Sequence, residues 1–251
     1  MQRAKIIVIE GTDGSGKETQ STRLFNYYKQ QGLKVKSYSF PKYSSPTGRI
    51  VGGPYLGKEE IGETYFPETS AGVDPLVSSM YYAADRRYNF LSDIEEDIYD
   101  NDVVILDRYT TSNMGHQVGK AKTDEEAMKI LKFIETLEFD LCELPRPDLV
   151  VFLHMPYEAA RDLRKSRKSG DGNENSESHL RNAEKAYVKI AELQGWHYID
   201  CLKSGAYSGL DDVKTIDEIS EEIISVVNER LVETPMIKRM TRFNEQKDNS
   251  N

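Results

Sequence analysis

Apolar residues along the chain form two kinds of run, short ones of strand length and longer ones with helical spacing. The short runs predict five strands, at residues 6–9, 35–40, 103–106, 149–153 and 198–199. The longer patterns predict helices at residues 18–31, 75–100, 124–138, 157–167, 177–194 and 216–232. Strands that alternate with helices need crossover connections, so we expect an α/β fold in which helices cover both faces of a five-stranded parallel sheet.

Two of the predicted helix ends carry their own signals. Gly32 follows the pattern at 18–31, in the position that a C-cap glycine takes. Asp74 and Pro75 precede the next helical pattern, as an N-cap residue and a first-turn proline do. We therefore expect that helix to begin at Pro75.

The predicted elements belong to one domain, residues 1–234. A chain of 251 residues, of which 38% are hydrophobic, is long enough to bury one α/β core. Residues 235–251 show no sustained period, and we expect a disordered tail there.

The composition argues against several classes of protein. A formal net charge of −9 disfavours general binding to nucleic acid, because lysine and arginine dominate that binding. No stretch approaches the roughly 18 apolar residues of a membrane span, and the first residues lack the apolar run of a signal peptide. Cys142 and Cys201 lie far apart without metal-ligand spacing, which fits a reducing compartment. We expect a cytoplasmic protein that binds neither nucleic acid nor a membrane.

A glycine-rich loop stands between the strand at 6–9 and the helix at 18–31. It reads Gly11, Thr12, Asp13, Gly14, Ser15, Gly16 and Lys17. The glycines let successive backbone N–H groups point at one spot, and the dipole of the following helix favours an anion there. Lys17 is then placed to reach the β- and γ-phosphates of a nucleotide. A plain turn is the alternative, but the strand–loop–helix context favours phosphate binding.

A second polar pair follows the strand at 103–106. Asp107 and Arg108 come directly after it, at the carboxyl edge where open parallel sheets bind ligands. An acidic residue there commonly helps to hold magnesium, and the planar fork of an arginine suits a phosphate. Taken alone the pair is equally consistent with a structural ion pair. Together with the glycine loop it indicates phosphoryl transfer.

Five segments of the chain resemble the thymidylate kinase family in their order and spacing. They are EGTDGSGKETQ in the glycine loop, FP at 40–41, YYAADRR, DRYTTSNMGHQ and LPRPDLVVFL, within about residues 5 to 200. The resemblance implies a P-loop NTPase fold of the adenylate-kinase type with a mobile lid. It also implies transfer of the γ-phosphoryl of ATP to dTMP with Mg²⁺, and a homodimer.

The same resemblance assigns the acceptor site. Tyr82 matches the aromatic that stacks on the base and Arg86 the arginine at the thymine edge, and a spacing of four places both on one helix face. The remaining substrate-binding residues are Asp13 at the sugar 3′-hydroxyl, Phe40 beside base or sugar, Arg108 at the acceptor phosphate, His116 near the 2′ position, and Gln117, which stands where the family often has glutamine. Core positions are the alternative for Phe40 and Tyr82, and a core or surface position for His116.

The basic segment RDLRKSRK at 161–168 precedes a polar stretch and by composition alone reads as a solvated helix end beside a loop. In the family the catalytic arginine comes either from the glycine loop or from the lid. Because Gly14 occupies the loop position here, the resemblance moves that role to a lid at about 161–180. The candidates are Arg161, Arg164 and Arg167.

The sequence also departs from the family pattern. Glu18 follows Lys17 where a Ser or Thr is usual, and Thr19 points about 100° away on a helix, although both belong to the expected ATP-binding segment 11–19. Either Glu18 binds Mg²⁺ or it turns outward and leaves the ion to Asp107 and the phosphates. Lys42 and Tyr43 stand where relatives have an arginine for the acceptor phosphate, so a kinase for another deoxynucleotide or deoxynucleoside is one alternative. The changed loop leaves a second one, a catalytically weak nucleotide-binding protein.

Overall fold

The computed structural model describes residues 3–165 and 177–231. The expected tail at 235–251, part of the expected lid at 161–180, and Arg167 lie outside the described residues. None of the helices in the described ranges has the length and hydrophobicity needed to cross a membrane.

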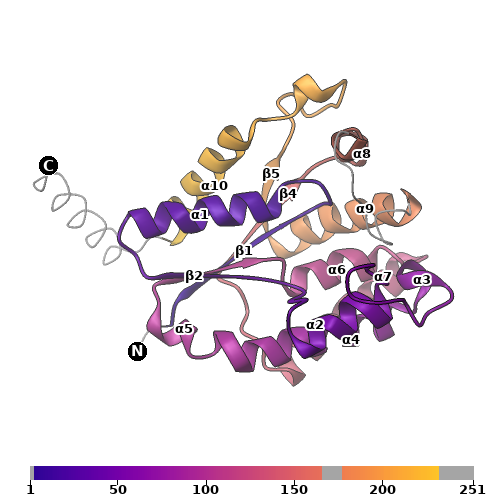
Figure 1. Ribbon diagram of the computed structural model, residues 1–251. Helices are drawn as coiled ribbons and strands as arrows, with labels where there is room; N and C mark the ends of the chain where they lie inside the picture. The colour runs from indigo at the N-terminus through magenta and orange to yellow at the C-terminus, as the bar shows by residue number, and fades with distance from the viewer. Residues whose placement is uncertain (1–2, 166–176, 232–251) are drawn as a thin grey trace, which may run out of the picture.

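Five parallel strands form the single sheet, as the sequence predicts (Figure 1). They are β1 (Lys5–Gly11), β2 (Val35–Ser39), β3 (Val103–Asp107), β4 (Leu149–His154) and β5 (His197–Asp200), in the order β2-β3-β1-β4-β5. Because all strands are parallel, their carboxyl ends meet at one edge of the sheet. Register places Ile9 beside Asp107 and Gly11 beside Leu153, which brings the glycine loop between the ends of β3 and β4.

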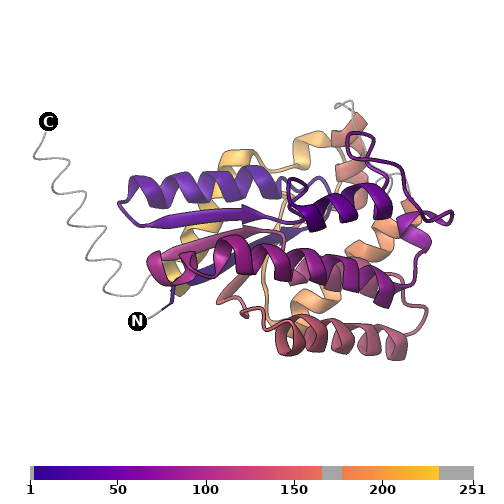
Figure 2. The same cartoon turned by 60° about the horizontal axis from the view of Figure 1, so that its bottom comes forward.

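Helices cover both faces of the sheet, so the predicted three-layer α/β/α class is confirmed. The helices are α1 (Lys17–Gln30), α2 (Pro46–Ile50), α3 (Thr69–Gly72), α4 (Pro75–Asn89), α5 (Asp97–Asp100), α6 (Thr110–Val118), α7 (Asp124–Glu135), α8 (Tyr157–Lys165), α9 (Glu177–Gln194) and α10 (Ile216–Leu231). Shorter turns are π-helical at Val51–Tyr55, Phe90–Ile94 and Thr136–Leu141, and 3₁₀ at Leu210–Asp212. α1 and α10 lie on one side of the sheet, and Figure 2 turns the opposite layer, including α4 and α7, toward the viewer.

Successive side chains of β1 point to opposite faces of the sheet and so contribute to the core on both sides. Ile7 and Ile9 pack with α1 and α10, while Ile6 and Val8 face the other layer. All four side chains are at most 1% exposed, so the sheet is buried on both faces and holds the loop after β1 rigidly.

Both predicted helix ends are confirmed. Gly32 adopts φ 79°, and its N–H donates to the carbonyl of Lys29 at 3.1 Å. The carboxylate of Asp74 accepts from the N–H groups of Leu76 and Val77, and α4 begins at Pro75.

The prediction of one continuous helix at 75–100 is wrong. α4 ends at Asn89, and a π turn at Phe90–Ile94 and then α5 follow it. Phe90, Ile94 and Ile98 are spaced by four and all pack in the same core cluster. In an α-helix, residues four positions apart are rotated by about 40° relative to each other, so a row with this spacing drifts away from the sheet. The wider π turn offsets this rotation, so the three side chains still face the sheet. The pattern at 124–138 likewise ends as α7 at Glu135 and continues as a π turn. The sequence also did not predict α2, α3 and α6.

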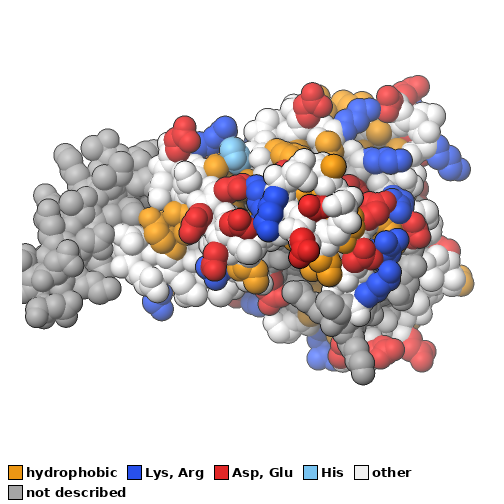
Figure 3. Space-filling model, turned by 90° about the horizontal axis from the view of Figure 1, so that it is seen from above, with side chains coloured by type: hydrophobic (Ala, Val, Ile, Leu, Met, Phe, Trp, Pro, Cys, Tyr) orange, Lys and Arg blue, Asp and Glu red, His pale blue; other side chains and the backbone are white. Residues whose placement is uncertain are grey.

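Acidic and basic side chains are interspersed over the face that carries α1 and α10, without a broad basic patch among the described residues (Figure 3).

Candidate active site

The glycine loop, residues 11–17, joins β1 to α1 and follows a path that only glycine adopts without strain. Gly14 has φ 85° and Gly16, the residue before α1, has φ 81°. A Cβ atom on Gly11 would lie 2.5 Å from the carbonyl oxygen of Leu153 in β4. The loop is thus pressed against the end of β4.

Thr12 fastens this loop to the end of β4. Its hydroxyl donates to the carbonyl of Met155 at 2.6 Å and accepts from the N–H of the same residue at 2.9 Å. Because both functions of the hydroxyl are used within the protein, Thr12 contributes to the loop chiefly through its backbone.

Lys17 holds its ammonium group inside the loop. Nζ donates to the carbonyls of Gly11 at 2.8 Å and Thr12 at 2.9 Å, and the residue is 6% exposed. Burial and the charge of Arg108 lower the pKa of Lys17 to about 8. The sequence-predicted cation therefore lies directly under the glycines, where a phosphate bound by the loop would meet it.

Asp13 and Arg108, predicted from separate segments, form an ion pair. Nη2 of Arg108 donates to Oδ1 of Asp13 at 2.8 Å. Burial alone would raise the pKa of Asp13, but the charges of Arg108 and Lys17 and this hydrogen bond hold it well below its usual range. Arg108 has φ 63°, a strained backbone region for a residue with a side chain, and such strain concentrates at functional sites.

Asp107 ends β3 with one carboxylate oxygen available. Oδ2 accepts from the hydroxyl of Ser39 at 3.2 Å, while Oδ1 is buried and has no hydrogen-bond partner among the described residues. Burial raises the pKa of Asp107. Glu18 and Thr19 are exposed in the first turn of α1. No three His, Cys, Asp or Glu side chains within residues 3–165 and 177–231 are grouped to hold a metal by themselves.

Glu10, a fully buried carboxylate just before the glycine loop, was not among the predicted site residues. Its oxygens accept from the N–H of Gly11 at 2.9 Å and from the hydroxyls of Thr111 at 2.7 Å, Ser112 at 2.6 Å and Tyr187 at 3.3 Å. These donors make a buried carboxylate tolerable and tie β1 to α6 and α9. The one signal in the sequence was an acidic residue that interrupts the apolar run of β1.

A cavity beside Asp13, called here the acceptor cavity, brings most of the predicted acceptor residues together. It is lined by Asp13, Phe40, Pro41, Tyr43, Leu56, Tyr82, Arg86, Arg108, Ser112, Asn113 and His116. Gln117 is buried but does not line the cavity. Ser112 and Asn113 were not predicted, although both stand in the segment that follows Arg108.

One lining residue of the acceptor cavity, Arg86, belongs to a buried ion pair. Nε and Nη2 of Arg86 bind the two carboxylate oxygens of Glu138, the second at 2.7 Å, and neither residue is more than 2% exposed. Burial opposes the charge of Arg86, but Glu138 raises its pKa. Asn113 donates Nδ2 to Glu138 at 2.8 Å, and its buried Oδ1 has no partner among the described residues. The cavity wall therefore carries a fixed cation and an available acceptor.

His116 lies where this cavity meets a second one. Its Nδ1 is 3.4 Å from Nε2 of His179 in α9, and burial lowers its pKa to about 3. The imidazole is therefore neutral at neutral pH, and its ring rests edge-on against Tyr187. A neutral imidazole next to Asp13 supplies hydrogen bonding without added charge.

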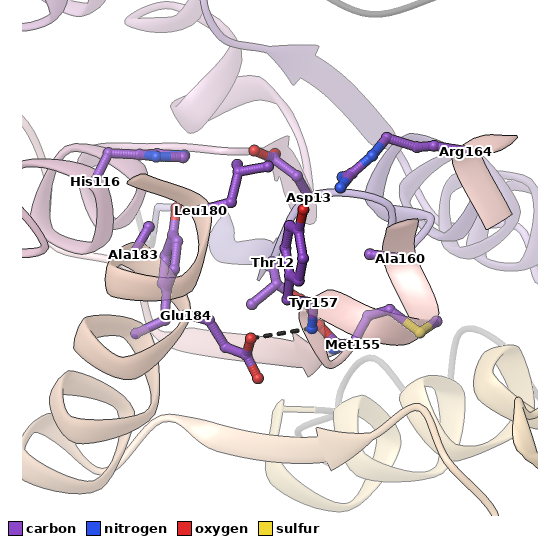
Figure 4. A pocket seen from close by; sticks show the side chains of 11 residues that line it. Thr12, Asp13, His116, Met155, Tyr157, Ala160, Arg164, Leu180, Ala183 and Glu184 are labelled. Atoms are coloured by element: carbon purple, nitrogen blue, oxygen red, sulfur yellow. Dashed lines mark hydrogen bonds between the residues drawn. The ribbon is translucent and has the colours of Figure 1, made fainter. Parts of the chain in front are cut away.

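The second cavity, called here the lid cavity, opens between the glycine loop, α8 and α9 (Figure 4). Arg164 extends from α8 into it, with its guanidinium carbon 5.8 Å from the ring centre of Tyr157. Arg161 instead pairs with Asp162 at 3.1 Å and does not line the cavity. Of the described lid candidates, Arg164 is the one that reaches the site.

Comparison with known proteins agrees with this geometry. A family model described as thymidylate kinase matches residues 9–206. The thymidylate kinase of Mycobacterium tuberculosis (strain H37Rv) is 28% identical over 202 residues, covering 76% of this chain and 87% of that protein. The thymidylate kinase of Prochlorococcus marinus (strain MIT 9312) is 28% identical over 224 residues, covering 89% and 97%.

Solved structures support the fold. Thymidylate kinase from Candida albicans matches with a TM-score of 0.63 at 22% identity, covering 90% of this chain and 92% of that one. The Ehrlichia chaffeensis enzyme matches with a TM-score of 0.57 at 19% identity, covering 90% and 99%. With the family model spanning most of the chain, this protein belongs to the thymidylate kinase family.

Proposed function

We propose that the protein transfers the γ-phosphoryl group of ATP to dTMP, giving ADP and dTDP. The observation that carries the proposal is that Arg86 and Asn113, both bound to Glu138, line the same cavity as Asp13 of the glycine loop. Thymine presents a carbonyl acceptor beside its N3–H donor. The guanidinium and the available Oδ1 of Asn113 match that order, whereas cytosine presents the opposite one.

The charged groups around Asp13 have separate tasks in this reaction. An oxygen of the dTMP phosphate attacks the γ-phosphorus, and the bond to the oxygen bridging to the β-phosphate breaks, so that ADP leaves. Lys17 and the loop N–H groups hold the donor phosphates, and Arg108 holds the acceptor phosphate. Arg164 closes from the lid side over the transferring oxygens. Fixed cations of this kind stabilise the charge that develops in the transition state.

Magnesium fits the donor side of the site. The buried, unpartnered Oδ1 of Asp107 is the type of ligand that Mg²⁺ takes together with phosphates and water. When bound, the ion would neutralise negative charge on the phosphates. The exposure of Glu18 favours the arrangement in which Asp107 and the phosphates hold the ion.

This arrangement predicts different results at the two carboxylates. Asp107→Asn is expected to raise the Mg²⁺ concentration for half-maximal rate by about tenfold or more, whereas Glu18→Ser shifts it by less than about threefold. The measurement is a Mg²⁺ titration of ADP formation at fixed ATP and dTMP. A larger shift for Glu18→Ser than for Asp107→Asn would assign the ion to Glu18.

The expected homodimer has a candidate surface on α4. Leu76, Met80, Tyr88 and Leu91 recur at helical spacing along α4 and the turn after it, and each is 37% to 49% exposed. Single exposed apolar residues are ordinary, but a continuous stripe marks an interaction surface. We propose that this stripe packs against the same stripe of a second copy.

A charge in the stripe tests the dimer. Met80→Asp is expected to weaken self-association by about thirtyfold or more, the effect of a central interface residue, because a carboxylate would be desolvated there. Sedimentation over a concentration series measures the change. Leu210→Asp, an equally exposed leucine in the turn before α10, is the matched control. A Met80→Asp protein that associates like the wild type would place the interface elsewhere.

The proposed reaction is tested by a coupled assay for ADP with ATP, Mg²⁺ and a panel of acceptors. We expect dTMP to be preferred over dCMP, dGMP and thymidine. A preference for one of the other acceptors would make the protein a kinase for that compound. Binding of ATP or dTMP without formation of ADP would make it a nucleotide-binding protein. The cytoplasm remains the expected location.

A further inference from the structure

Three side chains form a continuous hydrogen-bonded chain that ends at Glu184 in the wall of the lid cavity. The hydroxyl of Tyr198 in β5 lies 2.5 Å from Nδ1 of His154 in β4, and Nε2 of His154 lies 2.9 Å from Oε1 of Glu184 in α9. The other oxygen of Glu184 accepts from the N–H of Tyr157 at 3.0 Å, the bond drawn in Figure 4. The chain thus runs from the molecular surface to the first residue of α8.

The proton positions in this chain follow from its end members. Burial and then the charge of Asp200 raise the pKa of Tyr198 to about 12, so the phenol keeps its proton and donates to His154. An imidazole that accepts at Nδ1 can donate from Nε2. Glu184 accepts at both oxygens, so the Nε2–H tautomer of His154 gives every group in the chain a hydrogen-bond partner.

The strands place these groups on one face. Phe152 and His154 alternate onto the same side of β4, and Tyr198 is the register partner of Phe152 in β5. α9 covers that side, since Tyr187 stacks on Phe152 at 5.5 Å. The side chains of His154 and Glu184 are 15% and 20% exposed, so their hydrogen bond is largely shielded from water.

The hydrogen bond between Glu184 and the N–H of Tyr157 holds the first residue of α8. The N–H of Tyr157 belongs to the first turn, where no intrahelical partner exists, and a carboxylate there also meets the positive end of the helix dipole. α8 carries Arg164, and the ring of Tyr157 lies 5.8 Å from the guanidinium carbon of that arginine. Fixing Tyr157 therefore fixes the base from which Arg164 enters the lid cavity.

We propose that Tyr198, His154 and Glu184 act as positioning residues that hold α8, and with it Arg164, in register with the glycine loop. The proposal rests on the proposed phosphoryl transfer, because its catalytic consequence is the placement of Arg164 over the transferring group. It adds to the reaction three residues that do not touch the nucleotide's reacting atoms.

Kinetics of two variants at Glu184 test the catalytic part. Glu184→Ala is expected to lower kcat about tenfold or more with the KM for dTMP unchanged within about twofold, because a charged hydrogen bond to α8 is lost while the acceptor cavity is untouched. Glu184→Gln keeps an oxygen for Tyr157 and is expected to recover kcat to within about threefold of the wild type. Glu192→Gln, at an exposed position of α9, is the matched control.

Imidazole ¹⁵N NMR of the nucleotide-free protein tests the chain without turnover. We expect wild-type His154 to be protonated at Nε2, and Glu184→Gln to move the proton to Nδ1, because the glutamine amide then donates to Nε2. If Glu184→Ala fails to fold, Tyr198→Phe, a change at a partly exposed ring, is expected to lower kcat about threefold and to release the tautomer preference.

The outcomes separate the two proposals. A wild-type protein with the expected tautomer but no activity toward dTMP would overturn the proposed function and leave the hydrogen-bonded chain standing. An active wild type in which Glu184→Ala lowers only the melting temperature and not kcat would overturn the positioning role. Wild-type His154 protonated at Nδ1 would overturn the chain itself.

Discussion

Replacing Lys17 with alanine is expected to lower kcat for ADP formation by about a thousandfold, the upper range for removing one preorganised charge from a transition state. The ammonium is buried beneath the glycine loop and held by the carbonyls of Gly11 and Thr12. No other described cation lies inside that loop, so nothing replaces it at the phosphates. The measurement is the coupled assay at saturating ATP and dTMP.

Lys29→Ala is the control for this variant. Lys29 is exposed in the last turn of the same helix, and its removal is expected to leave kcat within about twofold, as for surface substitutions generally. Because Lys17 also binds two loop carbonyls, the melting temperature of each variant is measured alongside. A folded Lys17→Ala protein with wild-type kcat would contradict the assignment of the loop as the ATP site.

The elements with local signals were predictable from sequence. The glycine loop, the Gly32 and Asp74 helix ends and the apolar strands each depend on residues that are neighbours along the chain. α6 was not predictable in this way, because its residues serve as hydrogen-bond donors rather than as an apolar stripe. Thr111 and Ser112 bind Glu10, and Asn113 binds Glu138. The sequence of α6 is therefore determined more by these hydrogen bonds than by a helical pattern of apolar residues.

In the site, too, residues in local motifs could be predicted, whereas residues with partners distant in sequence could not. Asp13, Arg86 and Arg108 could be predicted as site residues because their motifs are local or resemble the family. Glu10 and Glu138 were missed, since an acidic residue in sequence reads as exposed until its partners are known. Glu138 meets Arg86 across 52 positions, and no periodic pattern records a contact of that separation.

The pair formed by Arg86 and Glu138 predicts the largest change in stability. Glu138→Ala leaves a guanidinium buried without its counter-charge and is expected to lower the free energy of unfolding by about 3 to 5 kcal/mol. Urea unfolding at 25 °C measures the change. Glu135→Ala is the control, because it removes a more exposed carboxylate 3.7 Å from Arg146, and it is expected to cost about 1 kcal/mol or less.

Combining Arg86→Met with Glu138→Leu separates stability from binding. With both charges gone no ion is left buried and unpaired, so the double variant is expected to regain most of the stability lost in Glu138→Ala. Binding of dTMP, measured by calorimetry, is expected to weaken by about a hundredfold, since the proposed donor to the thymine carbonyl is absent. A stable double variant that binds dTMP like the wild type would show that Arg86 supports the fold alone, and the base contact would then have to come from elsewhere in the acceptor cavity.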